Sequence, residues 1–228
     1  MPQPLSRVMP GASVIMCNAG DRPLKHNPEL GLLAMEAIIS WSNVERFMLN
    51  MYLELMGGSQ DLAAVSFLAQ ETQSAKKAAI NAVAKHVLDE KCFELLQAIL
   101  EASKPGKSGR DKLAHWTWGY SPNIPDGFLL ADPRNTHTDL DKNLIYVYKK
   151  QDFLNIIKLN DELCGFGLRF RWMLTGHIAN KEDKLYRELC AEPLLRDKLP
   201  RRPPPRAFSN SAKRRTSMRL EAVSNLAA

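Results

Sequence analysis

The segment from Gly109 to Trp116 combines residue types that can bind a phosphate and move a proton. It reads Gly-Arg-Asp-Lys-Leu-Ala-His-Trp, with Arg110 and His115 five positions apart and Asp111 beside the arginine. An arginine holds phosphate oxygens through its planar fork, and a histidine exchanges protons near neutral pH. Metal-free RNA cleavage can use both groups, because the 2′-OH loses a proton, the 5′-oxygen gains one, and the phosphorus carries extra negative charge.

The spacing allows a second interpretation of these residues. On a helix, Arg110 and His115 are about 140° apart around the axis and about 7.5 Å apart along it, so both can reach a phosphate lying across the helix end. Alternatively, Arg110 and Asp111 form a solvated pair at the helix start and His115 caps its C-terminus. A similar pair, Arg171 and His177, lies in a strongly apolar stretch. We interpret that second pair as structural.

Other residues near the motif have both a functional and a structural interpretation. Lys107 and Lys112 can attract phosphate, although a solvated helix face also explains them. Trp116 can stack on a base, or it can close the hydrophobic core. Glu45 can support the site from an earlier helix, or it can be a surface carboxylate paired with Arg46 or a lysine.

Length and charge predict one folded body followed by a basic tail. A chain of 228 residues with 45% apolar residues is long enough for one domain with appendages. Residues 196–228 contain nine Lys and Arg but two Asp and Glu, which leaves a net charge of −1 for residues 1–195. We expect residues 191–228 to be a disordered basic tail, which either holds RNA through charge or keeps the protein soluble.

The cysteines and histidines predict neither a metal site nor a cofactor. The cysteines stand far apart without paired spacing, which favours a reducing cytoplasm over a disulfide framework. They are Cys17, Cys92, Cys164 and Cys190. The histidines outside the motif lack metal-ligand spacing. The short apolar stretch 12–17 is too weak for a signal peptide or a membrane span.

The remaining elements are predicted to be mostly helical. Residues 1–26 are expected to be a flexible leader. A long helix is predicted to begin at Asn27, Pro28 and Glu29 and to end at Gly57, since Asn caps a helix and Pro suits its first position. Further helices are expected at 59–69, 72–88, from Asp89 to before Pro105, at 152–174 and, capped by Asn180, through 189. Residues 128–131 and 144–148 are expected to pair as strands.

The motif and its surroundings resemble the HEPN superfamily of nucleotide-binding helical proteins. That family carries an arginine, a polar residue and a histidine after a short gap, as Arg110, Asp111 and His115 do here. The resemblance covers residues 27–190 in architecture and 110–119 at the motif. In this family the second position is most often Asn, and many members have Gly where Trp116 stands.

The resemblance implies a homodimeric, metal-independent endoribonuclease that leaves cyclic phosphate ends. Arg110 and His115 would be catalytic and Asp111 would support them. From their position beside the motif, Lys107, Lys112 and Trp116 are the expected RNA contacts. Members often act as toxins or in phage defence with an antitoxin or other regulatory partner. The alternative is a non-catalytic helical dimer that binds protein or RNA. We therefore expect an all-α, HEPN-like bundle at 27–190 with a small β-hairpin insertion after the motif helix.

Overall fold

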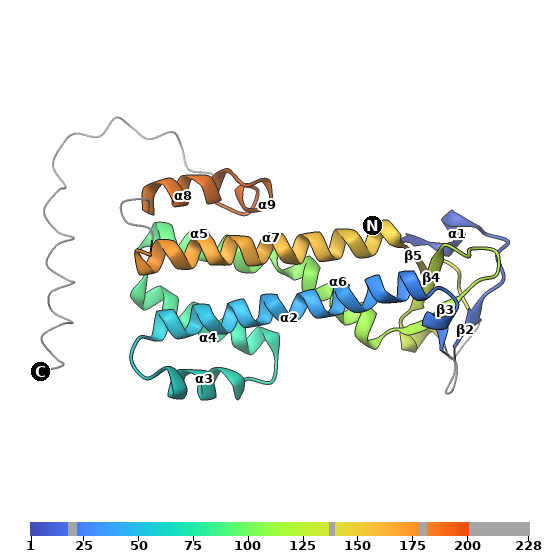
Figure 1. The fold of residues 1–228 in the computed structure, drawn as a ribbon, viewed down its shortest axis with the longest axis horizontal. Helices are drawn as coiled ribbons and strands as arrows, with labels where there is room; N and C mark the ends of the chain where they lie inside the picture. The colour runs from blue at the N-terminus through green and yellow to red at the C-terminus, as the bar shows by residue number, and fades with distance from the viewer. Residues whose placement is uncertain (18–21, 137–139, 178–181, 201–228) are drawn as a thin grey trace, which may run out of the picture.

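The computed structural model describes residues 1–17, 22–136, 140–177 and 182–200. It is an elongated helical bundle with a small antiparallel sheet at one end (Figure 1). The helices are α1 (Leu5–Val8), α2 (Pro28–Met56), α3 (Gln60–Leu68), α4 (Gln73–Val87), α5 (Glu90–Ala102), α6 (Lys104–His115), α7 (Lys150–Thr175), α8 (Glu182–Ala191) and α9 (Pro193–Arg196). The strands are β1 (Gln3–Pro4), β2 (Ile15–Met16), β3 (Thr117–Tyr120), β4 (Gly127–Ala131) and β5 (Ile145–Lys149), and short 3₁₀ turns occupy Pro23–Lys25 (η1) and Pro133–Asn135 (η2).

The two long helices, α2 and α7, form the spine of the bundle and run in the same direction away from the sheet (Figure 1). The predicted helix signals are confirmed at their ends. Asn27 accepts a hydrogen bond from the backbone N–H of Leu30, and Gly57 follows α2 with φ 58°. Gly176 ends α7 in the left-handed conformation that favours glycine. The predicted cap Asn180 lies outside the described residues.

The larger hydrophobic core lies between the spine and the helices that cover it. Its fully buried members include Trp41 and Met48 of α2 and Phe170 of α7. Leu195 of α9 is also fully buried in this cluster. The folded body therefore extends past residue 190, where we expected the tail to begin. Residues 201–228, the rest of that predicted tail, lie outside the described residues.

The sheet has the strand order β1-β5-β4-β3-β2, with every neighbouring pair antiparallel. The predicted pairing of β4 with β5 is confirmed, with Leu129 opposite Val147. The sheet is larger than the expected hairpin. The expected flexible leader supplies β1 and β2, and its Leu5 and Ala12 are buried at 0% and 2% exposure against one sheet face. The fold is thus mostly helical, which agrees with the expected helical bundle with a β insertion, but the strands form a five-stranded sheet rather than a hairpin.

Helix α6 carries the motif and begins earlier than the sequence suggested. Helix α5 ends at Ala102, before Pro105 as predicted, but Pro105 and Gly106 already lie in the first turn of α6. Proline suits a first turn because the N–H that it lacks has no helical partner there. A Cβ at Gly106 would lie 2.5 Å from Oδ1 of Asn160 in α7. Glycine therefore lets α6 pack closely on the spine, and the motif occupies the second half of α6 rather than its start.

Candidate functional site

An open cleft of about 760 Å³ lies along one side of α6. Its walls come from α6, α2, the start of α4 and the turn after β4. The cleft contains every residue that the sequence nominated: Glu45, Lys107, Arg110, Asp111, Lys112, His115 and Trp116. The other lining residues are Trp41, Glu71, Thr72, Gln73, Lys76, Lys104, Ser108, Asp132 and Arg134. The structure thus brings the candidate residues to one concave surface.

Helix α6 presents these side chains because its opposite side is fixed to the bundle and the sheet. Leu113 is 2% exposed and packs among the residues between the helices and the sheet. A Cβ at Gly109 would meet the Ile156 side chain of α7 at 3.4 Å, so α6 also lies close to the spine. Lys107 and Asp111 stand four residues apart and therefore share the face that lines the cleft.

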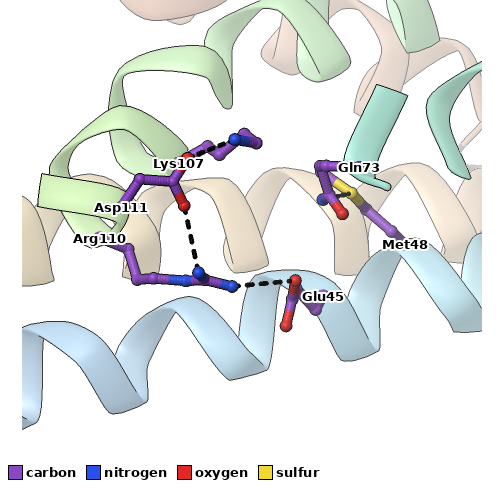
Figure 2. A network of polar contacts seen from close by, with 6 residues as sticks. All are labelled: Glu45, Met48, Gln73, Lys107, Arg110 and Asp111. Carbon is purple, nitrogen blue, oxygen red and sulfur yellow. Dashed lines mark hydrogen bonds and ion pairs between the residues drawn. The ribbon is translucent and has the colours of Figure 1, made fainter. Parts of the chain in front are cut away.

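A chain of alternating charges holds Arg110 in the cleft (Figure 2). Nη1 of Arg110 donates to Oδ1 of Asp111 at 3.1 Å, and its Nη2 lies 3.7 Å from Oε1 of Glu45. The other carboxylate oxygen of Asp111 accepts from Nζ of Lys107. Asp111 therefore connects two cations, and Glu45 pairs with Arg110 rather than with Arg46 or a lysine. All four side chains are partly exposed, so a phosphate entering the cleft can compete for Arg110.

The cleft wall carries six Lys and Arg side chains and four Asp and Glu side chains. Several of these carboxylates already form ion pairs with an arginine or a lysine. Two hydrogen bonds from the Arg134 side chain and one from its backbone N–H lower the pKa of Asp132 to about 2. In the described chain no ion pair joins Lys76 or Lys112 to a carboxylate. The start of α4 adds the partial positive charge of a helix N-terminus at Thr72. The cleft therefore favours an anion.

His115 is the last residue of α6, and its side chain is exposed at the cleft. Across the described residues, no hydrogen bond or ion pair engages its imidazole. The alternative in which His115 caps the helix C-terminus therefore has no hydrogen bond to support it, whereas Arg110 and Asp111 do form the pair that this alternative required. An exposed imidazole beside a cationic cleft can exchange a proton with a bound ligand.

The two tryptophans after the motif differ in role. Trp118 donates from its indole N–H to the backbone oxygen of Leu113 at 3.0 Å and packs edge-on against Phe128. Trp116 is half-buried, lines the cleft and lies 5.7 Å from Tyr146 between ring centroids. Trp118 therefore closes the core between the helices and the sheet. Trp116 keeps part of its surface available to a ligand.

The second arginine–histidine pair lies outside this cleft. Nε of Arg171 donates to Oε1 of Glu54 at 2.8 Å, which links α7 to α2. His177 stacks on Trp172 at a centroid distance of 6.2 Å. The arginine and the histidine thus each contact a different structural neighbour, as the structural interpretation of this pair requires.

No family model, curated protein or solved structure matches the chain. In the described segments, no group of three or more His, Cys, Asp and Glu side chains is placed to hold a metal ion. No helix among the same residues is both long and apolar enough to cross a membrane.

Sequence reasoning missed the residues that other elements add to the cleft. Thr72, Gln73 and Lys76 come from the start of α4, and Asp132 and Arg134 come from the turn after β4. The helix expected at 72–88 begins at Thr72, and Pro133 interrupts the helical pattern, but neither signal indicates which elements meet. Only the packing of α4 and the sheet around α6 brings these residues to the motif.

Proposed function

We propose that this protein is a metal-independent endoribonuclease of the HEPN type, with its active site in the α6 cleft. The observation that carries the proposal is the joint exposure of Arg110, Asp111 and His115 on one cationic concave surface. The charge of the cleft fits the RNA backbone, which dominates the affinity of proteins for nucleic acids. The motif resemblance adds the reaction class.

In the proposed reaction the neutral imidazole of His115 accepts the proton of a ribose 2′-OH. The 2′-oxygen then forms a bond to phosphorus, the bond to the 5′-oxygen breaks, and the products carry a 2′,3′-cyclic phosphate and a 5′-hydroxyl. Arg110 stabilises the extra negative charge at phosphorus. Its geometry is set by Asp111, which accepts from Nη1, so Asp111 is a positioning residue. Water, or a second His115 in a homodimer that joins two clefts, would protonate the leaving oxygen.

The deciding experiment incubates the purified full chain with mixed RNA in EDTA. Wild-type protein is expected to cut the RNA and leave cyclic phosphate ends. His115→Ala is expected to lower the rate by about 10²- to 10⁴-fold, and Arg110→Ala by about 10²- to 10³-fold. His177→Ala is the matched control, because this histidine is also exposed but stacks on Trp172 away from the cleft.

Two results would contradict the nuclease proposal. If His115→Ala and His177→Ala leave cleavage at the same level as wild type, the activity comes from a contaminant or another site. If wild type does not cut RNA of any kind, the cleft has another function.

A non-catalytic helical interaction module is the second candidate, favoured by the apolar side chains that α2 and α3 expose. Leu32 and Ile39 of α2 are 72% and 59% exposed, and Leu62 of α3 is 74% exposed. Exposed apolar side chains that recur along a helix face suit a protein partner or a second copy of the chain. This candidate predicts a stable dimer or complex in which RNA remains intact.

A further inference from the structure

The ammonium group of Lys112 lies over two aromatic rings, those of Trp116, which lines the cleft, and Tyr146, which lies beside Trp116. Its Nζ is 4.9 Å from the ring centroid of Trp116 and 5.5 Å from that of Tyr146. These side chains come from α6, the residue after α6, and β5. Both rings are half-buried, so each retains exposed surface. Sequence patterns did not single out Tyr146, because its position beside Trp116 depends on the register of the sheet.

Trp116 connects this aromatic pair to the part of the cleft that holds Arg110 and His115, whereas Tyr146 does not line the cleft itself. Trp116 follows His115 directly, so their Cα atoms are about 3.8 Å apart. Trp116 also lines the same cleft as Arg110. A nucleotide whose phosphate contacts Arg110 and His115 therefore has an aromatic surface within reach of its base.

We propose that Trp116 and Tyr146 form a stacking surface for an unpaired nucleobase, which makes single-stranded RNA the substrate class of this site. The inference rests on the proposed ribonuclease function, because it places the reacting phosphate between Arg110 and His115. An unpaired base exposes its face to an aromatic side chain, whereas an A-form duplex keeps its bases stacked and its major groove deep and narrow.

Lys112 can add a phosphate contact to this stacking surface. In the described chain its cation has aromatic faces beside it and no carboxylate within ion-pair distance. When a base covers Trp116, the flexible lysine stem can carry the ammonium to a neighbouring phosphate. Trp118 cannot substitute for Trp116, since its indole N–H is bonded to Leu113 and its ring packs on Phe128. The stacking surface is therefore specific to Trp116 and Tyr146.

The test measures binding of the full chain in EDTA to three short probes that carry the same number of phosphates per strand. The first is single-stranded 2′-O-methyl oligoadenylate, whose blocked 2′ position prevents cleavage. The second is the same strand annealed to 2′-O-methyl oligouridylate, and the third is an oligomer of abasic tetrahydrofuran phosphates. Wild type is expected to bind the single strand about tenfold more tightly than the other two. The basic segment 196–228 contributes similarly to single strands of equal charge, so it does not create the difference from the abasic probe.

Substitutions assign the preference to the aromatic pair. Trp116→Ala is expected to lose about tenfold in affinity for oligoadenylate and nothing for the abasic oligomer, whereas Trp116→Phe loses less than about threefold. Lys112→Gln is expected to reduce the salt dependence of oligoadenylate affinity by about one released ion, while the preference for the base-bearing probe over the abasic one remains. Thermal unfolding checks each variant, and Tyr146→Leu supplies the same comparison if Trp116→Ala does not fold.

Three results would overturn the inference. The first is that wild type binds the duplex and the single strand with equal affinity. The second is that Trp116→Ala loses as much affinity for the abasic probe as for the base-bearing one. The third is that wild type does not bind single-stranded RNA. Failure of the nuclease proposal is distinguishable, because binding with a base preference but without cleavage of unblocked RNA removes the reaction and keeps the stacking surface.

Discussion

Nη2 of Arg110 in α6 lies 3.7 Å from Oε1 of Glu45 in α2, across the cleft that both residues line. The contact joins the motif to a helix far earlier in the chain (Figure 2). It also means that Arg110 is not a free cation. A phosphate must share Arg110 with this carboxylate or replace it, so Glu45 limits how tightly the cleft holds an anion.

Removing the charge of Glu45 is expected to strengthen RNA binding. Glu45→Gln should raise the affinity for single-stranded RNA by about fivefold, since an exposed ion pair contributes up to about 1 kcal/mol and that energy corresponds to such a factor. Titration with a non-cleavable strand at fixed salt measures this change. Glu54→Gln is the matched control, because it breaks the Arg171 pair on the same helix outside the cleft. Weaker RNA binding by Glu45→Gln would instead mean that the carboxylate assists the ligand.

Asp111 is expected to act through its hydrogen bond rather than its charge. Asp111→Asn keeps an acceptor for Nη1 of Arg110 and should keep kcat within about threefold of wild type. Asp111→Leu removes the acceptor and should lower kcat by about tenfold, because the arginine loses its fixed geometry. Steady-state cleavage of one RNA substrate compares the variants. Equal losses in both would show that the negative charge itself matters.

The interpretation of sequence succeeded where the signal was local. Asn27 caps α2 through its own neighbour Leu30, Asp89 caps α5 through Cys92, and Gly176 adopts the conformation that ends α7. Each of these signals acts within a few residues, so it can be recognised without knowing the rest of the fold. The motif was found for the same reason, because Arg110, Asp111 and His115 all lie in one helix.

The interpretation failed where structure depends on distant partners. Gln3 forms a strand because it pairs with Val147, and Ile15 does so because it pairs with Tyr120. Two-residue strands have no periodicity of their own to recognise. The place of Gly106 inside α6 was not predicted, because the side chains of Trp41 and Asn160, which exclude a Cβ there, come from other helices. Glycine at that position reflects packing rather than a turn.

Two glycines of α7 provide a matched test of how closely the spine helices pack. A Cβ at Gly167 would lie 2.2 Å from the Phe47 ring of α2, whereas a Cβ at Gly165 would meet no atom within 4 Å. Gly167→Ala should therefore lower the free energy of unfolding by about 1–3 kcal/mol through overpacking. Gly165→Ala should raise it by about 0.5–1 kcal/mol, because alanine loses less backbone entropy in a helix. Denaturant unfolding measures both, and equal changes would contradict the close contact.

Stability is expected to fall at alkaline pH because of Cys92. Burial, followed by the hydrogen bond and charge of Asp89, raises the pKa of the Cys92 thiol to about 12 from its ordinary value of 9.0. The folded chain therefore keeps a proton that the unfolded chain releases above about pH 9. The stability from this group is complete below pH 9 and is lost as the pH rises toward 12. Thermal midpoints across this range measure the decline.

A substitution at the same position checks that assignment. Cys92→Ser removes the thiol and should flatten the decline in the thermal midpoint between pH 9 and pH 12. Asp89→Asn keeps an acceptor for the α5 cap and removes the nearby negative charge, so the Cys92 thiol should ionise at lower pH than in wild type. Ultraviolet absorbance of the thiolate follows the titration. An unchanged pKa in Asp89→Asn would leave burial as the whole cause.

The pairing of β1 with β5 also sets an order of events during protein synthesis. Gln3 cannot form its strand until Val147 has been made, and at cellular rates of translation that delay is on the order of ten seconds. During this interval Leu5 and Ala12 have no sheet face to pack against, because that face includes Ile145 and Val147. The chain's first residues are therefore among the last to be placed, and these uncovered apolar side chains are where a nascent chain of this protein would most need a chaperone.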